Sequence, residues 1–151
     1  RPPSPERDRI LAHLDGDPDE QNGHLTGSAL VVDHERRRTL VLFHTKLGKW
    51  LQPGGHVEPG DADLAATARR EATEETGIAG LTVSVQPADV DVHWVGTHFH
   101  YDVRYVVTAP HGAQPTGNHE STELRWITAD QLDEIDADAS LRRLVAAAHL
   151  G

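Results

Sequence analysis

The sequence predicts an α/β fold in which a mixed β-sheet lies between layers of helices. Three observations lead to this prediction. Runs rich in β-branched residues recur along the chain, helix-forming stretches stand at its start, middle and end, and Gly- and Pro-containing segments separate them. With 151 residues the chain can bury a core of its own, so a single domain over residues 1–151 is expected.

Seven strands are expected along the chain. They are residues 25–33, 39–44, 50–52, 81–85, 89–95, 98–108 and 123–127. The polar turn 34–37 joins the first two as a hairpin, and the third leads into a glycine-rich loop. The segment 109–120 contains prolines, glycines and an asparagine, which predicts a loop before the last strand.

The expected helices flank these strands at residues 5–14, 62–76, 129–135 and 140–150. The first places Ile10, Leu11 and Leu14 on one side. The second is Ala-rich, and Asp61 or Asp63 can cap its start, while Gly77 can end it in a left-handed conformation. Its stripe of small residues is predicted to pack closely on the sheet: Ala65, Ala68 and Ala72.

The second helix also carries three glutamates on one side. At about 100° per residue, Glu71, Glu74 and Glu75 fall within an arc of roughly 100°. Such a run alone is more often a solvated helix face than a site. Carboxylates this crowded repel one another, however, and a bound cation would relieve the repulsion. Hard oxygen ligands on a short arc suit Mg²⁺ or Mn²⁺, which would bridge to the phosphates of a substrate.

Residues 53–78 closely resemble the Nudix box, whose consensus is G-x5-E-x7-R-E-U-x-E-E-x-G-U, with U a bulky aliphatic residue. The positions that fit are Gly55, Arg70, Glu71, Glu74, Glu75, Gly77 and Ile78. Asp61 stands where the first glutamate is expected, and eight residues instead of seven separate it from Arg70. The extra residue falls between the loop and the helix, so no family role is carried over to Asp61.

The resemblance implies a Nudix-type α/β/α sandwich, MutT-like in size, that hydrolyses a nucleoside diphosphate linked to another moiety with the help of a divalent metal. The metal ligands that it implies are Gly55, through its carbonyl, Glu71, Glu74 and Glu75. Arg70 would be a brace that orients a carboxylate of the box. The family often places a further catalytic or metal-binding glutamate in the loop near the last strand, where Glu120 is the first candidate and Glu123 the second.

This reaction would be an attack of water on phosphorus. Metal lowers the pKa of bound water and neutralises charge on the bridging oxygen. A carboxylate that stays free enough to take the proton is also needed, and Glu71 and Glu120 are the candidate bases.

The strand His98–Arg104 has a polar face. His98, His100, Asp102 and Arg104 alternate with apolar and aromatic residues and so point to one side of the sheet. We expect this face to line the substrate cleft beside the box helix, with His56 as a further polar contact. Arg104 is the expected phosphate contact, so that Arg104→Ala should raise KM with little change in thermal stability. His98-x-His100 is also a zinc pattern, but a third histidine at familiar spacing is missing.

The composition limits the partners. A net charge of −10 without a basic stripe argues against a nucleic-acid polymer, and a polyphosphate would be repelled unless metal intervenes. Cysteine is absent, which excludes disulfides and thiolate chemistry. No apolar run approaches the length of a membrane span, so a soluble cytoplasmic protein without a membrane partner is expected. A homodimer is left open as the assembly.

Two other functions are considered. A catalytically idle Nudix domain could bind a nucleotide as a sensor or regulator, but the intact Glu71, Glu74 and Glu75 argue against it. A relative of isopentenyl diphosphate isomerase would normally need a catalytic cysteine, which this chain lacks. The markers of the Nudix subfamilies do not match downstream of the box, so the expected substrate is limited to a nucleoside diphosphate derivative.

Overall fold

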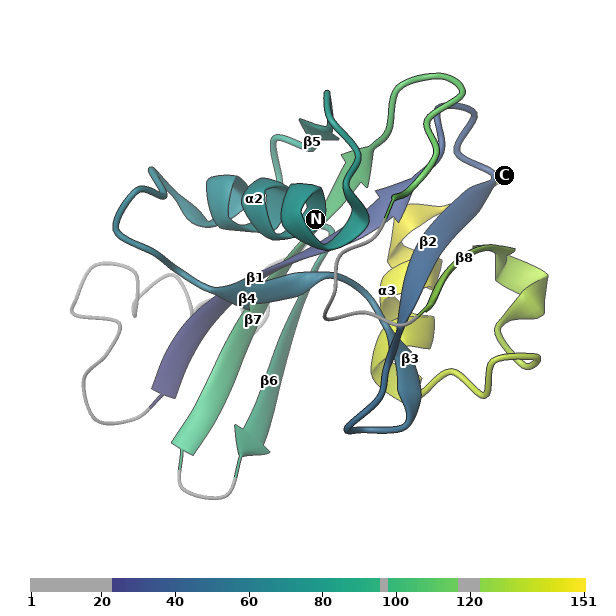
Figure 1. Cartoon of the computed structure of the whole chain (residues 1–151). Helices are drawn as coiled ribbons and strands as arrows, with labels where there is room; N and C mark the ends of the chain where they lie inside the picture. The colour runs from purple at the N-terminus through teal and green to yellow at the C-terminus, as the bar shows by residue number, and fades with distance from the viewer. Residues whose placement is uncertain (1–22, 96–97, 117–122) are drawn as a thin grey trace.

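The computed structural model describes residues 23–95, 98–116 and 123–151. The predicted helix 5–14 and Glu120 lie outside these residues. In chain order the elements are β1 (Gly23–Val32), β2 (Arg38–His44), β3 (Lys49–Leu51), β4 (Gly54–His56), α2 (Leu64–Thr76), β5 (Thr82–Val83), β6 (Asp89–Val95), β7 (His98–Thr108), β8 (Glu123–Thr128), the 3₁₀ turn η1 (Ala129–Gln131) and α3 (Ala139–Ala148) (Figure 1).

The strands form one mixed sheet, as predicted. Its main order is β3-β2-β1-β7-β5, with β4 also on β1, β6 on β7 and β8 on β2. β1 and β7 run parallel from Gly23↔Phe99 to Val32↔Thr108, and every other pair is antiparallel. β2 pairs with β1 only at the far end, so the edge of β1 at Thr26–Ser28 is open to β4.

The sequence prediction differs from the structure at two elements. Residues 54–56 were expected in a loop, but they pair with β1 as the short strand β4 because that edge of β1 would otherwise lack partners. The predicted helix 129–135 is reduced to the turn Ala129–Gln131. Beyond it, Asp136 has a positive φ of 51°, which ends any helical continuation.

Helices cover both faces of the sheet, which confirms the α/β class. α2 packs Leu64, Ala68 and Ala72 on one face, against odd-numbered residues of β1 and β7 such as Ala29 and Val107. α3 packs on the other face. There, even-numbered residues of β1 and β7 contact the helix: Leu30, Val32 and Val106 on the strands, and Leu141, Leu144, Val145 and Ala148 on α3. A residue's parity on these two strands therefore tells which helix it faces.

The caps and the small residues of α2 place it close to the sheet. Asp63 caps the helix by accepting a hydrogen bond from Ala66 N at 2.8 Å, and Gly77 ends it with φ 72°. A Cβ on Gly27 would lie 2.8 Å from the carbonyl oxygen of Leu64, so only glycine permits this approach. Within the three described ranges, no helix has the length and apolar character that a membrane span requires.

Candidate active site

The carboxylates of α2 lie directly over the glycine strand β4. Gly54 N donates a hydrogen bond to Glu75 Oε2 at 3.0 Å. A Cβ on Gly55 would collide with the Glu71 carboxylate. Because glycine has no side chain, the Glu71 and Glu75 side chains reach the backbone of β4.

Arg70 holds this arrangement together through charged hydrogen bonds. Its Nε and Nη2 donate to the two carboxylate oxygens of Asp61, each at 3.0 Å, and Nη2 also donates to the His56 carbonyl at 3.0 Å. Its Nη1 reaches Glu71 and Glu74, both at 3.3 Å. Arg70 thus connects the helix, the loop before it and β4, which is the geometry of a brace.

Asp61 has a structural role that the one-residue insertion had left open. Its side chain is only 5 % exposed. It accepts the two bonds from Arg70, one from Thr67 Oγ1 at 2.9 Å and one from Glu58 N at 2.9 Å. The bonds from Arg70 hold the pKa of Asp61 well below its usual range, so the carboxylate is ionised at neutral pH.

The donor set fits a hard cation by its chemistry. Glu71, Glu74, Glu75 and the Gly55 carbonyl supply only oxygen, which Mg²⁺ and Mn²⁺ prefer. In residues 23–95, 98–116 and 123–151, no three acidic, histidine or cysteine side chains already converge as metal ligands. At this site the three glutamates have protein partners instead: Arg70 bonds Glu71 and Glu74, and the Gly54 amide bonds Glu75.

Glu71 is the carboxylate best placed to exchange a proton. Burial raises its pKa above the ordinary value of 4.5, and Glu74 and Glu58 add to this, while Arg70 opposes it. A protonated Glu71 cannot bind a cation, so Mg²⁺ affinity should increase as pH rises through this raised pKa. The raised pKa also means that the metal-free protein loses stability as pH rises over this range, because its folded state holds the proton more tightly than the unfolded state.

Titrations of Mg²⁺ by calorimetry across pH 4 to 8 (about the range in which such a carboxylate ionises) would measure this dependence. We expect the affinity midpoint above 4.5 in the wild type and no such step in Glu71→Gln. A midpoint at or below the ordinary value would contradict the assignment of Glu71 as a buried metal ligand.

The prediction that the polar strand face lies beside the box helix is wrong. His100, Asp102 and Arg104 are even-numbered residues of β7 and point to the face that α3 covers, opposite α2. The strand alternation was correct, but the pairing of β7 with β1 decides which side meets which helix. His56 pairs with Thr26 and is exposed on this same face, whereas the side chain of His98 lies outside the part of the chain that the structure describes.

Arg104 is also not an accessible phosphate contact, because its side chain is fully buried. Its Nη1 and Nη2 donate to Ser140 Oγ and Ser140 O, each at 2.5 Å. Nε lies 3.6 Å from Asp89 Oδ2 and Nη1 lies 3.5 Å from Asp91 Oδ2. Arg104 therefore fastens β6 and β7 to the start of α3.

Asp102 is buried as well, with hydrogen bonds to its oxygen Oδ1 from Thr26 Oγ1 at 2.9 Å and Ser28 Oγ at 2.7 Å. Burial raises its pKa, while these two bonds and Arg104 oppose the change. A Cβ on Gly54 would collide with Ser28 Oγ, so the Asp102–Ser28 pair lies directly under the glycine strand. Sequence reasoning missed Ser28 and Asp61 in these roles because their partners are distant or separated by an irregular loop.

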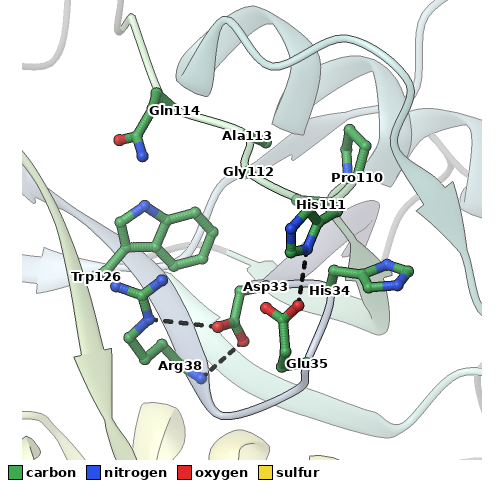
Figure 2. Close-up of a pocket in the computed structure, with 11 residues that line it drawn as sticks. Asp33, His34, Glu35, Arg38, Pro110, His111, Gly112, Ala113, Gln114 and Trp126 are labelled. Carbon is green, nitrogen blue, oxygen red and sulfur yellow. Dashed lines mark hydrogen bonds and ion pairs between the residues drawn. The ribbon is translucent and has the colours of Figure 1, made fainter.

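A concavity lies at the end of β1 that is away from β4. Its lining comes from the turn after β1, from residues 109–114 and from Trp126 of β8 (Figure 2). The Arg38 guanidinium lies 5.3 Å from the Trp126 ring centre and bonds to Asp33, while Glu35 pairs with His111 at 2.9 Å. Asp33 is five residues beyond Ser28 on the chain, or about 16 Å along an extended strand, so this pocket is separate from the box carboxylates.

Comparison with known proteins identifies the class. Residues 24–148 match the family described as NUDIX domain, so the chain belongs to the Nudix hydrolase family, whose members act on pyrophosphate-containing substrates. The family generally uses a divalent metal.

Three particular proteins show what this chain is similar to in sequence or in fold. A MutT-like protein from Streptomyces ambofaciens is 30 % identical over 129 residues, which cover 82 % of this chain and 77 % of that protein. An Ap4A hydrolase from C. elegans superposes with a TM-score of 0.70 at 18 % identity, over 82 % of this chain and 93 % of the other. The NUDIX domain of Shewanella oneidensis NrtR, solved with ADP ribose, has a TM-score of 0.66 at 17 % identity, over 91 % and 95 % of the two chains.

Proposed function

We propose that this protein is a Mg²⁺- or Mn²⁺-dependent pyrophosphohydrolase that cleaves a nucleoside diphosphate linked to another moiety, by attack of water on phosphorus. One observation carries the proposal: in a chain of the Nudix family, the carboxylates of Glu71 and Glu75 reach the backbone of the glycine strand β4, and Arg70 bonds Glu74 as well as Glu71. The assignment of these residues and of Gly55 as metal ligands is part of the proposal.

The chain's own residues would have distinct tasks. Glu71, Glu74, Glu75 and the Gly55 carbonyl would hold the metal, which when bound supplies positive charge to the phosphates and acidifies water. Arg70, fixed by Asp61, keeps Glu71 and Glu74 on the side of the helix that faces the site. Where Glu71 is not itself bound to the metal, it is one candidate to accept the proton of the attacking water, because a base must stay free enough to take that proton. Glu120 is the other candidate base, and Glu123 is the second candidate for the further catalytic or metal-binding glutamate.

The presence of Glu71, Glu74 and Glu75, with Arg70 bonded to two of them, supports a hydrolase over a catalytically idle domain. The second candidate function is a nucleotide-binding domain without catalysis. It is motivated by the NrtR domain, which has the same fold and was crystallised as a complex with ADP ribose. A binding domain would take up a nucleotide and release it unchanged. Substrate class and catalysis are therefore tested together.

The test is incubation with Mg²⁺ and separate nucleotide classes in heavy-oxygen water, with the products identified by mass. Nucleoside triphosphates, dinucleoside polyphosphates and nucleoside diphosphate sugars form the series. We expect turnover of at least one class and one heavy oxygen in a single phosphate product. Binding of a nucleotide without turnover would establish the idle-domain alternative, and label on a sugar or base carbon would contradict attack on phosphorus.

A further inference from the structure

Three histidines from different strands meet on the face of β4 that is opposite α2. Their ring centroids form a nearly equilateral triangle: His24–His56 5.6 Å, His24–His100 5.8 Å and His56–His100 5.6 Å. The sheet fixes this grouping, because His24 and His100 are direct partners across β1 and β7, and His56 pairs with Thr26 two residues along β1. His24 and His100 are half-buried and His56 is exposed, so the triangle is open to solvent on one side.

We propose that His24, His56 and His100 form a site for a borderline-soft divalent cation of the Zn²⁺ type, distinct from the oxygen ligands of α2. Three imidazoles around one tetrahedral zinc ion, with Zn–N distances of about 2.0–2.1 Å, would have ring centroids roughly 5 Å apart. The observed triangle is only slightly wider than this. Each ring would contribute one nitrogen to the metal, and the other nitrogen could take a hydrogen bond that orients the ring.

The triangle requires side-chain rotation before it can hold an ion. With the side chains as they stand, no three histidine, cysteine or acidic residues in the described parts of the chain are placed to hold a metal ion, and this applies to the triangle as it does to the glutamates of α2. Neighbouring strands already fix the Cβ positions, so the change is confined to χ1 and χ2 of the three histidines. Such rotations are small compared with a backbone rearrangement.

A fourth histidine supports the assignment from the adjoining strand. The His93 ring centroid is 5.4 Å from that of His100, and His93 Nδ1 lies 3.4 Å from Asp91 Oδ2. A carboxylate on one ring nitrogen orients the imidazole and directs the other nitrogen outward, as is usual for metal-binding histidines. His93 could therefore complete the coordination or replace water at the fourth position.

The site can be tested by direct Zn²⁺ binding in excess Mg²⁺, measured by calorimetry or equilibrium dialysis on the whole chain. Mg²⁺ occupies oxygen ligands and does not compete for imidazole, so it masks the glutamates. We expect one Zn²⁺ per chain in the wild type. His24→Ala, His56→Ala and His100→Ala should each weaken binding by more than about 10-fold, since even an outer partner of a metal ligand contributes that much.

His111→Ala is the matched control. His111 also lies near one other histidine ring, His34 at 5.8 Å, and near the Glu35 carboxylate, but it is remote from the triangle. Its variant should bind Zn²⁺ like the wild type. Absence of Zn²⁺ binding under these conditions, unchanged binding in the three triangle variants, or equal loss in His111→Ala would each overturn the proposal.

A second readout separates binding from folding. Zn²⁺ should raise the Tm of the wild type and of His111→Ala, but much less that of the triangle variants, because a ligand of the native state stabilises it. Circular dichroism without metal shows whether each variant is folded. If His100→Ala does not fold, the exposed His56→Ala still decides the question. None of these measurements depends on hydrolysis, so the proposed activity and the zinc site can fail separately.

Discussion

Glu75→Gln is expected to reduce turnover by roughly 100-fold or more, the usual cost of losing one electrostatic contact to a transition state, while the fold remains intact. The reason is that glutamine keeps an oxygen that can accept the 3.0 Å hydrogen bond from Gly54 N but has no charge for the metal. Glu74→Gln should behave likewise, because its carboxylate lies on the same side of α2. The measurements are kcat, Mg²⁺ affinity and Tm.

The matched control is Glu134→Gln. Glu134 is as exposed as Glu74, with side chains 56 % and 55 % accessible, and it also faces an arginine, but it lies outside the box. Its variant should retain full activity. If Glu74→Gln and Glu75→Gln were both as active as this control, the carboxylates of α2 would not be the metal ligands.

Arg104→Ala should destabilise the protein strongly, by about 3–5 kcal/mol, the usual cost of breaking a buried ion pair by removing one partner. Its guanidinium is fully buried, and its loss leaves Asp89, itself 5 % exposed, without that cation and leaves Ser140 without two hydrogen bonds. This reverses the sequence-based expectation of a raised KM with unchanged stability. Urea unfolding of the metal-free protein gives the free-energy difference.

Two further arginines provide a graded comparison. Arg143 contacts the same acids, Asp89 at 3.1 Å and Asp91 at 2.6 Å, but its side chain is 49 % exposed, so Arg143→Ala should cost less. Arg125 is 41 % exposed and lies 3.8 Å from Glu134, and Arg125→Ala should change stability by no more than about 1 kcal/mol. A raised KM with normal stability in Arg104→Ala would restore the original interpretation.

Local signals were sufficient for much of the fold. The β-branched runs gave the main strands, and Asp63, Gly77 and the alanine stripe gave the limits and the packing face of α2. They failed where pairing with a distant strand decides the structure. β4 contains two glycines and no β-forming pattern, and it is a strand only because β1 offers it an unpaired edge.

The candidate site divides in the same way. The box was recognisable from residues spaced along one helix, because neighbours at i+3 and i+4 share a helix face. The role of Asp61 was not, since an irregular loop lets its carboxylate reach Arg70 despite the extra residue. Nor could the third histidine of the triangle be found by spacing, because His24 is far from His100 in sequence and adjacent to it only in the sheet.

The sequence by itself determined the family, the α/β class and the row of carboxylates on α2, because each depends on residues within one short segment. Only the tertiary structure decided which face of the sheet each side of β7 meets. Alternation makes His100, Asp102 and Arg104 neighbours on one side, but the parallel pairing of β7 with β1 and the docking of α3 turn that side away from α2. These contacts join residues far apart in the chain, so no local pattern could have assigned Arg104 to the core.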